Sequence, residues 1–589
     1  MVYQIAKNMH EKREEYIHKD TYNNKEFNLI GIFAKNCVEW ELADLACQLD
    51  SITTVTLYAT LGENSFKYIC DQTNITTIFL SPDLVDTFLK YNSNLELNTI
   101  KNIILFDLTV YCTEQHFSKL KEKGFNVYSL KKDFIEKESN VKESELIISN
   151  ADTVLTICYT SGTTGNPKGA MVIQRNMVSV LEGVIASSAV PVNQYSAHFS
   201  FLPLAHIMER MILIGHLSLG ARVGFLAGSV RTTLLEDISL VEPTLLVLVP
   251  KVLQRVRTGI FETVNKGPYI VKEMFCRALA IKKRNYFKYH TLEHFFLDKV
   301  VFSKIRKKFG RNLKAMLCAS APLPEDISLD IKLLLSCPIV EGWGMTELSG
   351  SAFCTNLYDP LNLSNGGIIE TGKVKLVDIP DLGYTKDRVV NGVKMPSGEI
   401  CVYGPMTFIG YYKDPEETAK TLDKDGYVHT GDVGCIKEGN GIKIVDRIKE
   451  IFKLSQGEYI IPSKLESVYS NCKYVNQIMI YGNSYKNNII AIIVPNLKKC
   501  AEFLGKNNVT VQELKQSKEL NNEIKSDLLK LANEAKFNSL EKVNYFILSE
   551  EEFSIENQCL NPSMKIVRKK VETYFKKEID QLYDSIDLN

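Results

Sequence analysis

The chain lacks any apolar run long enough to cross a membrane, which takes about 18 consecutive residues or more. Its longest apolar runs, residues 245–249 and 489–494, have the length of single strands. The first twenty residues are charged and contain no apolar segment of the kind found in secretory signals. Val2 stands where N-myristoylation needs Gly, and the chain ends in Asp-Leu-Asn without a prenylation motif. These absences predict an intracellular protein without a membrane-spanning anchor.

An excess of either charge is also missing, because 70 Lys and Arg balance 70 Asp and Glu. Nothing in this balance favours nucleic acid, and we expect no nucleic-acid partner. The 14 cysteines form no CxxC pair and no regular spacing, so neither a disulfide framework nor a cysteine metal site is predicted. The sequence therefore indicates a soluble cytosolic enzyme that keeps its thiols reduced.

What the chain has is the ordinary composition of a globular protein, 45% hydrophobic and 24% charged, at a length that exceeds a single core. Between about residues 27 and 130, short apolar runs alternate with amphipathic segments. Residues 29–33, 77–80 and 103–106 are predicted strands, and residues 39–49 have the period of a helix. Residues 154–159 repeat the strand pattern. Strand and helix in alternation predict a parallel sheet with helical crossovers.

The pattern changes after about residue 392. Gly, Pro and Asp separate short β-rich runs at 398–402, 426–429 and 441–445, which predicts a β-rich subdomain over about 392–446. We place the main boundary after residue 447. The predicted fold class is α/β: a large, multi-subdomain N-terminal α/β domain over residues 1–447, then a small, mobile α+β domain over residues 448–589.

The segment TSGTTGNPKG at residues 160–169 directly follows the strand predicted at 154–159. It lacks the GxxxxGK[ST] spacing of a Walker loop. Its glycines free the backbone so that N–H groups can approach phosphate oxygens, and the hydroxyls and the lysine add donors and positive charge. The alternative is a flexible surface turn, but the preceding strand favours a phosphate loop. The candidate phosphate-binding residues are Thr160, Ser161, Gly162, Thr163, Thr164, Gly165 and Lys168.

The segment EGWGMTE at residues 341–347 follows a strand end predicted at 338–340. Two glycines flank Trp343, so the backbone is open and the ring can face a ligand. Glu347 is a candidate to hold Mg²⁺ together with phosphate oxygens. A buried Trp beside a surface Glu is the alternative. The small-residue turn at Ala319, Ser320 and Ala321 suits a flat base ring, although it is a weak indication alone.

A carboxylate and a guanidinium, Asp432 and Arg447, are separated by a predicted hairpin. At that separation both side chains could reach the two hydroxyls of one ribose. The alternative is a simple salt bridge.

His206 lies in the segment FLPLAHIMER at residues 201–210, beside apolar residues. A lone His of this kind is more often structural than catalytic, and both interpretations stay open.

Lys565 ends the segment LNPSMK, about 400 residues after the phosphate loop. If one reaction needs both, the C-terminal part of the chain must fold back over the loop. This requirement predicts a two-domain enzyme with a moving lid.

Taken in order, YTSGTTGNPKGAM, FLPLAHIMER, EGWGMTE, DGYVHTGDVG, DRIKEIFKLSQGEYI and NPSMK resemble the adenylate-forming enzymes. Within that superfamily the chain is similar to the long-chain fatty-acid–CoA ligases, and residues 451–460 discriminate this group best. The resemblance runs from about residue 28 to about residue 571. It implies that ATP activates a long-chain fatty acid as acyl-adenylate, which CoA then converts to acyl-CoA with release of AMP and pyrophosphate.

The resemblance also implies roles for individual residues. Lys565, Thr346, Glu347 and His206 match catalytic positions, with Thr160 and Glu347 as the expected ligands of Mg²⁺. Lys449 matches the hinge about which the C-terminal domain rotates. The remaining matches concern bound nucleotide and CoA. The residues from 160 to 168 listed above match the β- and γ-phosphate site; Ala319, Ser320, Ala321, Gly342 and Trp343 match the adenine site; Asp432 and Arg447 match the ribose site; Ser455, Gly457 and Glu458 match the CoA-facing loop.

The implied cofactors are ATP, CoA and Mg²⁺, and the implied location is the cytoplasm or the cytosolic face of the endoplasmic reticulum or another membrane. Peripheral membrane contact and oligomeric state stay open.

One departure is the short stretch of about thirty residues before residue 28, where family members usually have more. Four alternatives therefore remain: a catalytically impaired homologue shortened at its N-terminus, a nucleotide- or acyl-binding protein, a ligase with another acyl acceptor, and a membrane scaffold acting through the basic stretch 565–577.

Overall fold

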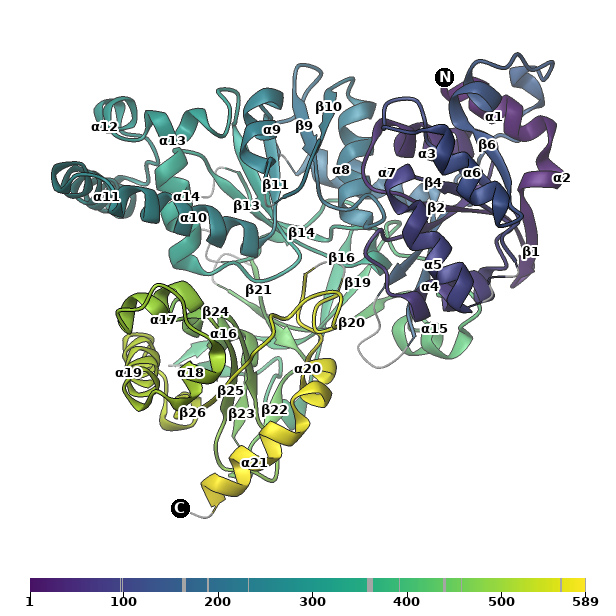
Figure 1. The fold of residues 1–589 in the computed structure, drawn as a ribbon. Coiled ribbons are helices and arrows are strands. Elements are labelled where there is room, and N and C mark those ends of the chain that lie inside the picture. The colour runs from purple at the N-terminus through teal and green to yellow at the C-terminus, as the bar shows by residue number, and fades with distance from the viewer. Residues whose placement is uncertain are drawn as a thin grey trace. The chain divides into compact units, whose positions relative to one another are not determined.

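A computed structural model describes the chain except for residues 96, 98, 161–165, 188–189, 231, 358–363, 391, 438–440, 457, 562–563 and 588–589. The chain folds into two compact units, and Figure 1 traces their ribbons from purple to yellow. Unit 1 comprises Met1–Ser320, Asp326–Lys375 and Cys401–Thr430, and unit 2 comprises Ala321–Glu325, Leu376–Ile400 and Gly431–Asn589.

The first sheet of unit 1 has the strand order β6-β5-β4-β2-β3-β7-β8, with β1 paired to β2 outside this order. Neighbouring strands from β6 to β7 run parallel, whereas β8 and β1 are antiparallel to their partners. The strands are β1 (His18–Tyr22), β2 (Lys25–Phe33), β3 (Thr53–Leu57), β4 (Thr77–Leu80), β5 (Asn102–Leu105), β6 (Asn126–Ser129), β7 (Val154–Thr160) and β8 (Lys168–Ile173).

Strand β2 shows how this sheet is buried on both faces. Leu29 and Phe33 belong to one hydrophobic core, and Ile30 and Ile32 belong to another, as the two-residue period of a strand requires. Trp40 joins the second core from a covering helix. Covered faces are what a mainly parallel sheet needs. The helices of this region are α1 (Val2–Glu11), α2 (Arg13–Tyr16), α3 (Val38–Leu49), α4 (Glu63–Thr73), α5 (Val85–Leu95), α6 (Glu114–Glu122) and α7 (Gln174–Ala186).

The second sheet of unit 1 has the order β10-β9-β11-β12-β13-β14-β15. Strands β10 to β13 run parallel to their neighbours, and β14 and β15 are antiparallel. Because β12 and β13 are parallel neighbours, the segments that leave their carboxyl ends, at residues 319–320 and 344–347, start side by side. The strands are β9 (Ala197–Ser200), β10 (Arg222–Phe225), β11 (Leu245–Leu248), β12 (Ala315–Cys318), β13 (Ile339–Trp343), β14 (Phe353–Cys354) and β15 (Gly367–Ile368).

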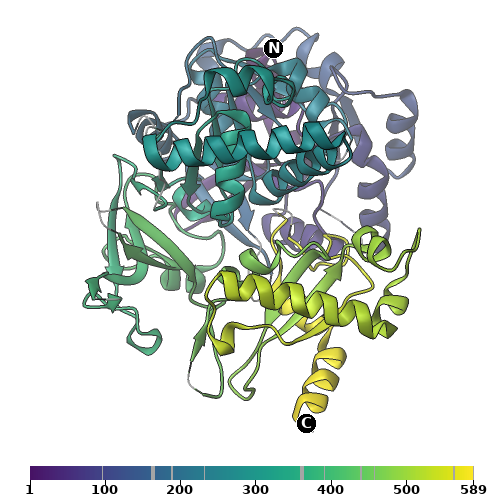
Figure 2. The same ribbon diagram turned by 90° about the vertical axis from the view of Figure 1, so that its left-hand side faces the viewer.

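Helices accompany this second sheet, and three of them gather at one end of unit 1. Figure 1 shows α11, α12 and α13 at the end away from α1 and α2, and Figure 2 views unit 1 from that end. The helices are α8 (Ile207–Ser218), α9 (Leu234–Val241), α10 (Pro250–Asn265), α11 (Tyr269–Tyr289), α12 (Phe295–Val300), α13 (Ser303–Lys307) and α14 (Glu325–Leu335).

A β-rich region follows, whose sheet has the order β16-β19-β20-β21. Strands β20 and β21 are antiparallel, with a register shift between Val433 and Gly434. The elements are β16 (Lys373–Val377), β17 (Val389–Val390), β18 (Val393–Lys394), β19 (Ser397–Tyr403), α15 (Pro415–Thr421), β20 (Val428–Ile436) and β21 (Ile442–Arg447).

The C-terminal part of unit 2 is a small α+β fold built on the sheet β24-β25-β26. Ile478 and Ile493 face a core that includes Leu528 of α19, and Met479 and Ile492 face a core that includes Val571 of α20. The elements are β22 (Phe452–Lys453), β23 (Tyr459–Ile460), α16 (Pro462–Tyr469), β24 (Val475–Tyr481), β25 (Ile490–Pro495), α17 (Leu497–Phe503), α18 (Val511–Gln516), α19 (Lys518–Glu534), β26 (Tyr545–Leu548), α20 (Arg568–Tyr574) and α21 (Lys576–Asp587).

The predicted α/β fold with a parallel sheet and helical crossovers is confirmed, and the predicted strands at 29–33, 77–80 and 154–159 lie within β2, β4 and β7. The run at 426–429 was predicted wrongly at its start, because Gly426 has a φ of 82° in a turn and β20 begins at Val428. The boundary at 447 concerns a rotating lid, which the division into compact units does not test, so it stays a prediction. Across the described residues, no helix has the length and apolarity of a membrane span.

Candidate active site

The antiparallel pair β7–β8 flanks the predicted phosphate loop, whose residues 161–165 lie outside the described part of the chain. Thr160 pairs in register with Lys168, and its hydroxyl lies 3.5 Å from the Lys168 carbonyl oxygen. The Lys168 ammonium makes an ion pair with Glu417 of α15 and lies 5.5 Å from the ring centroid of Tyr411. Hydrogen bonds from Lys168, and then from Lys420, lower the pKa of Glu417 to about 2. Glu417 thus fixes the lysine at the base of the loop.

Glu347 lies in the short 3₁₀ helix η4 (Thr346–Leu348) and is buried. The Tyr411 hydroxyl donates a hydrogen bond to Glu347 Oε1. Burial raises the pKa of Tyr411, and the neighbouring Glu347 carboxylate raises it further. The hydroxyl therefore stays protonated and able to donate.

Tyr411 lies between Glu347 and Lys168 because backbone hydrogen bonds hold the segment of residues 408–412 in place. The Phe408 amide donates to the Glu347 carbonyl oxygen at 2.9 Å. Further along this segment, the Met171 amide donates to the Gly410 carbonyl at 3.0 Å, and the Tyr412 amide donates to the Gly169 carbonyl at 2.8 Å. Backbone hydrogen bonds thus tie β8 to η4 through residues 408–412, the segment that carries Tyr411.

The segment after β13 depends on close backbone packing. A Cβ on Gly344 would lie 2.2 Å from the Gly350 carbonyl oxygen, so no larger residue fits there without displacing backbone. The half-buried Trp343 ring lies 5.1 Å from the Phe353 ring. Beside it, after β12, Ala319 is buried and Ser320 adopts a φ of 76°, a left-handed conformation that is uncommon for a side chain of this type.

His206 begins helix α8. Its Nδ1 accepts a hydrogen bond from the Met208 amide at 3.2 Å, so the side chain caps the helix. This contact gives His206 a structural role, while its placement at an acyl site stays a prediction.

In unit 2, Asp432 of β20 and Arg447 of β21 lie opposite each other in the ladder. Arg447 Nε lies 3.1 Å from Asp432 Oδ1. Asp432 is buried, whereas the Arg447 side chain keeps 41% of its surface exposed. A buried carboxylate held by a guanidinium that remains open to ligand suits a diol.

Lys565 projects from a tight turn that joins Leu560 to Ile566 across an antiparallel bridge. Asn561 closes this turn in two ways. Its side-chain Oδ1 accepts a hydrogen bond from the Lys565 backbone amide at 2.9 Å, and its own backbone amide donates to the Lys565 carbonyl at 2.9 Å. Met564, with a φ of 63°, completes the turn. The backbone conformation of Lys565 is therefore fixed by its own loop.

Desolvation by surrounding atoms lowers the pKa of Lys565 to about 8, repulsion from Arg447 adds to the shift, and attraction to Asp432 and Glu450 opposes it. The Lys565 side chain is exposed, which leaves it accessible to a ligand. Lys565 thus shares an electrostatic neighbourhood with the Asp432–Arg447 pair.

The predicted hinge, Lys449, lies on an exposed turn directly after β21. The amides of Glu450 and Ile451 donate to the Arg447 carbonyl at 3.0 and 3.2 Å, which closes the turn. The Glu450 carboxylate accepts from Arg568 Nε at 3.1 Å. Glu450, the residue after the predicted hinge, is therefore bound to Arg568, which follows Lys565 by three positions.

The predicted CoA-facing residues Ser455 and Glu458 lie in the β22–β23 hairpin, and both are exposed. The Leu454 amide donates to the Glu458 carbonyl at 2.9 Å, and the Ser455 amide donates to the Lys486 carbonyl at 3.1 Å. The Ser455 hydroxyl is also bonded to Asn487. The hairpin is thus held by backbone bonds, and Ser455 ties it to residues 486–487.

A family model described as AMP-binding enzyme matches residues 24–412, which is more than half of the chain. This chain belongs to the AMP-binding enzyme family. Fatty acyl-CoA synthetase B of Dictyostelium discoideum is 34% identical over 99% of this chain and 85% of its own length. Long-chain-fatty-acid–CoA ligase 1 of Homo sapiens is 33% identical over 95% of this chain and 78% of its own length.

Solved structures agree with this membership in an AMP-binding enzyme family. The A-PCP didomain of the carboxylic acid reductase from Segniliparus rugosus, determined with AMP, matches with a TM-score of 0.78 and 25% identity, over 100% of this chain and 75% of that one. The adenylation domain of the carboxylate reductase from Mycobacterium chelonae matches with a TM-score of 0.77 and 24% identity, over 99% of this chain and 83% of that one. The latter likeness concerns the fold alone.

Within this AMP-binding enzyme, the predicted residues fall into two clusters, one in each unit. Unit 1 brings together Thr160, Lys168 and Glu347, and unit 2 brings together Asp432, Arg447 and Lys565. Six predicted residues lie outside the described part of the chain: Ser161, Gly162, Thr163, Thr164, Gly165 and Gly457.

Sequence reasoning missed Tyr411, Glu417 and Arg568. The segment GYYKDPEET at residues 410–418 carries a turn glycine before two tyrosines and an acidic helix start, and that combination could have drawn attention to the first two. No local signal distinguishes Arg568 from the other basic residues near it.

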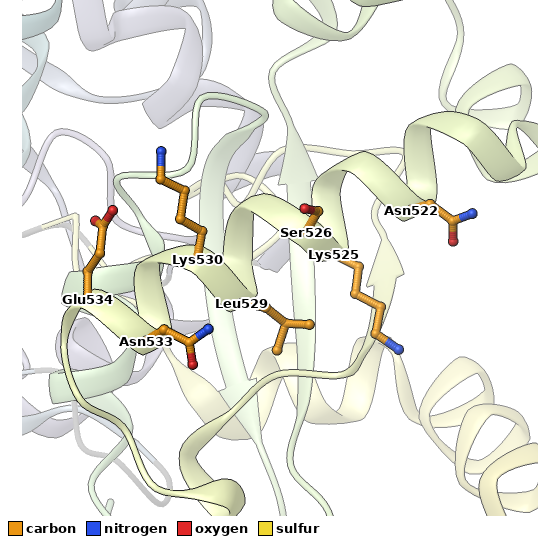
Figure 3. Close-up of a pocket in the computed structure, with 7 residues that line it drawn as sticks. All are labelled: Asn522, Lys525, Ser526, Leu529, Lys530, Asn533 and Glu534. Atoms are coloured by element: carbon orange, nitrogen blue, oxygen red, sulfur yellow. The ribbon is translucent and has the colours of Figure 1, made fainter.

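A shallow depression on unit 2 lies apart from these clusters. Its lining residues all come from one face of α19, and Figure 3 shows them along that helix, from Asn522 to Glu534. None of them is a predicted site residue, so the depression does not bear on the chemistry.

Proposed function

We propose that this enzyme activates a long-chain fatty acid with ATP and transfers the acyl group to CoA. The products are fatty acyl-CoA, AMP and pyrophosphate. The match to long-chain ligases over nearly the whole chain supports this activity. It also favours ligation over the rival view of a binding protein without catalysis.

The structural observation that carries the proposal is the neighbourhood of Lys565, Asp432 and Arg447. A carboxylate–guanidinium pair that suits a diol, together with a lysine that interacts with it electrostatically, would fit one nucleotide, with its ribose at Asp432 and its α-phosphate near Lys565. The lysine would stabilise charge that develops on the α-phosphate oxygens, as an oriented cation does for a developing oxyanion.

In the first step, a carboxylate oxygen of the fatty acid attacks the α-phosphorus of ATP. An oxygen–phosphorus bond forms, the bond to the pyrophosphate oxygen breaks, and pyrophosphate leaves. Positioning and charge stabilisation supply most of the catalysis in phosphoryl chemistry of this kind. Lys168 is suited to hold the leaving phosphates, because its ion pair with Glu417 fixes the position of a cation next to the predicted loop.

In the second step, the sulfur of CoA attacks the acyl carbonyl carbon. A carbon–sulfur bond forms, the bond to the AMP phosphate oxygen breaks, and the thiol proton passes to solvent. We infer that the C-terminal domain turns about Lys449 between the two steps, which removes Lys565 and presents Ser455, Gly457 and Glu458 to CoA. Such a domain motion is a reasonable rate-limiting step.

Mg²⁺ is expected with the triphosphate, and the residues present fit it. Thr160 and Glu347 offer only oxygen donors, which Mg²⁺ prefers in proteins. Tyr411 holds one carboxylate oxygen of Glu347 and so orients the other. When bound, the ion would neutralise phosphate charge; Glu347 and Thr160 would hold it, and Tyr411 would position Glu347.

ATP, CoA and fatty acids are intracellular metabolites, so we infer that the enzyme works in the cytoplasm or at the cytosolic face of a membrane. A direct test of the function is a CoA-ligation assay with saturated acids of increasing chain length. Formation of acyl-CoA with equimolar AMP, fastest with long-chain acids, is the expected result. Activity limited to short or aromatic acids would refute the long-chain assignment.

A ligase with another acyl acceptor is the second candidate, because a structural relative is a didomain with a carrier protein. Replacing CoA with a pantetheinylated carrier protein separates the two. Faster acyl transfer to the carrier than to CoA would favour this candidate.

A further inference from the structure

Residues 269–311, which we call the α11–α13 surface, expose large apolar side chains to an unusual extent. Phe295 is 90% exposed, Tyr269 76%, Ile270 71% and Phe287 65%. The others in this segment are Val271, Met274, Tyr289, Phe296 and Val300, each at least 49% exposed. Exposed apolar side chains that gather in one region mark protein or membrane interaction sites, whereas singly scattered ones need no explanation.

The same segment is strongly basic, although the whole chain is balanced at 70 positive and 70 negative residues. It contains twelve Lys and Arg but only three Asp and Glu, at 273, 293 and 298. The basic residues are Lys272, Arg277, Lys282, Lys283, Arg284, Lys288, Lys299, Lys304, Arg306, Lys307, Lys308 and Arg311. Positive charge is therefore concentrated on the part of unit 1 that exposes apolar side chains.

Most of these cations make no ion pair with a residue that the structure describes. Arg277 pairs with Glu273, Lys282 and Arg306 share Asp298, and Lys283 pairs with Asp330. For the rest, no ion pair joins the side chain to a residue that the structure describes: Lys272, Arg284, Lys288, Lys299, Lys304, Lys307, Lys308 and Arg311. Those eight cations are available to an anionic partner.

Apolar and basic side chains share one face of α11. Steps of three and four residues place side chains on one side of a helix. The outer stripe follows such steps and consists of the exposed Ile270, Met274, Arg277, Arg284 and Lys288 together with the half-buried Ile281. The opposite face is buried and consists of Phe275, Ala278, Leu279, Lys282 and Tyr286.

The buried face fixes the outward stripe in place. The Lys282 ammonium donates to Asp298 at 2.6 Å, to the Leu333 carbonyl at 2.6 Å and to the Ser336 hydroxyl at 2.7 Å. Phe275 packs edge-on against Phe302, with ring centroids 5.7 Å apart. α11 is therefore anchored to α12 and α14, and its outer residues form a stable surface rather than a loose end.

We propose that the α11–α13 surface binds the surface of an anionic lipid bilayer. Its aliphatic and aromatic side chains would enter the boundary between headgroups and acyl chains, and its unpaired cations would face the anionic headgroups. Exposed Ile, Met and Phe side chains argue against nucleic acid, which needs cations and stacking but gains little from aliphatic contact. Figures 1 and 2 show that the three helices lie together at one end of unit 1, as a single contact requires.

This inference goes beyond acyl-CoA formation and does not depend on it, although long-chain fatty acids themselves partition into bilayers. The test is flotation of the full chain with vesicles of phosphatidylcholine, alone or mixed with phosphatidylserine. The expected result is co-flotation with the mixed vesicles, little with phosphatidylcholine alone, and release by added salt because exposed charges are screened. Failure to float with mixed vesicles, or equal flotation with both kinds, would overturn the proposal.

Two pairs of variants locate the contact. Arg284→Gln with Lys288→Gln should weaken binding roughly 25-fold, about fivefold per lost charge. Phe295→Ser with Phe296→Ser should weaken it roughly tenfold or more, because two apolar side chains lose their burial. All four side chains are exposed, and a matching circular dichroism spectrum and thermal transition would show that the variants fold.

Matched controls come from unit 2. Tyr485 is also 90% exposed, so Tyr485→Ser removes comparable apolar surface elsewhere. Lys576→Gln with Lys577→Gln removes two charges from the basic C-terminal stretch. Both controls should bind like the unchanged protein. If the C-terminal pair loses binding while the α11 pair keeps it, the contact belongs to the C-terminus and the α11–α13 assignment is wrong.

Discussion

Arg568 binds Glu466 through two parallel hydrogen bonds, Nη1 to Oε1 at 2.8 Å and Nη2 to Oε2 at 2.7 Å. The same guanidinium donates to Glu450 and to the Ile480 carbonyl at 3.3 Å. One side chain therefore joins the segment after the predicted hinge, helix α16, strand β24 and the start of α20. Since Arg568 follows Lys565 by three positions, this network also holds the base of the turn that presents Lys565.

Arg568→Ala should destabilise unit 2 by about 3–5 kcal/mol, because it leaves the carboxylate of Glu466 without its partner in a low-dielectric site. Two charge-assisted bonds at good distance make the pair stronger than a surface ion pair. Urea unfolding of the full chain, followed by circular dichroism, would give the change in the free energy of unfolding.

Lys569→Ala is the matched control for Arg568→Ala, because it removes an exposed cation from the same helix. We expect a change within about 0.5 kcal/mol for that variant. Arg568→Met combined with Glu466→Met should recover part of the loss, since no charge is then left unpaired. A loss for Arg568→Ala as small as that for Lys569→Ala would show that the network carries little stability.

Lys565→Ala should slow acyl-adenylate formation about 10²–10³-fold or more, by comparison with removal of one oxyanion donor. It should largely keep thioester formation from supplied acyl-adenylate, because the proposed rotation removes Lys565 before that step. ATP–pyrophosphate exchange measures the first half-reaction, and acyl-CoA formation from synthetic acyl-adenylate measures the second. Equal losses in both would contradict a lysine that leaves the site, and Lys570→Ala should change neither.

The pH dependence of adenylation follows from the pKa of about 8 for Lys565. Lys565 is a charged ammonium below this pH and loses its proton and its charge above it. The kcat/KM for ATP should therefore fall as pH rises through about 8. This parameter reports the free enzyme. Lys565→Arg keeps its charge at all accessible pH values and should move the alkaline fall upward. An unchanged profile in that variant would assign the fall to another group.

Much of the fold could be predicted from the sequence, because a buried parallel strand needs a continuous apolar run and its crossover needs a helix period. Residues 77–80 and β4 coincide for this reason. The glycine-rich and acidic site residues could be proposed because their chemistry is visible locally. The predicted hairpin between Asp432 and Arg447 suggested that the two side chains lie close together. The pairing of β20 with β21 places them opposite each other.

The partners of these residues could not be predicted, because they come from distant parts of the chain. Lys168 and Glu417 are 249 positions apart, and nothing in either neighbourhood specifies the other. Tyr411 reaches Glu347 because backbone hydrogen bonds join residues 408–412 to β8 and to Glu347. Such contacts depend on tertiary packing rather than on local pattern. His206 shows the converse, since its local context did not reveal that its ring caps α8.

Tyr411→Phe should weaken adenylation about tenfold to a hundredfold at limiting Mg²⁺, because a hydrogen bond to a charged group contributes about 1.5–3 kcal/mol. The ring that contacts Lys168 is kept, so the loss isolates the bond to Glu347. Initial rates across a Mg²⁺ titration would measure it. Tyr412→Phe removes a neighbouring hydroxyl that binds Asp20 instead, and it should leave the Mg²⁺ dependence unchanged. Equal effects of the two variants would point to a general loss of packing.

Glu41 is a buried carboxyl group whose stability effect depends on pH. It is 5% exposed, and neither of its oxygens has a hydrogen-bond partner among the described residues. Burial raises its pKa to about 8, the nearby Asp44 adds to the shift, and Arg210 opposes it. An acid with a raised pKa stabilises the fold fully below its unfolded pKa of 4.5, and this contribution is lost as pH rises through about 8.

Glu41→Gln should therefore stabilise the protein by about 2–4 kcal/mol more at pH ~8 than at pH ~5.

Glu39 on the same helix is the control. Burial tends to raise the pKa of Glu39, but hydrogen bonds from Thr109 and Val110 outweigh burial and lower it. Its contribution is present above the unfolded pKa of 4.5, so Glu39→Gln should destabilise the protein at both pH values. Urea unfolding of both variants at the two pH values tests the opposite signs, and a gain for Glu41→Gln that does not depend on pH would show that ionisation is not its cause.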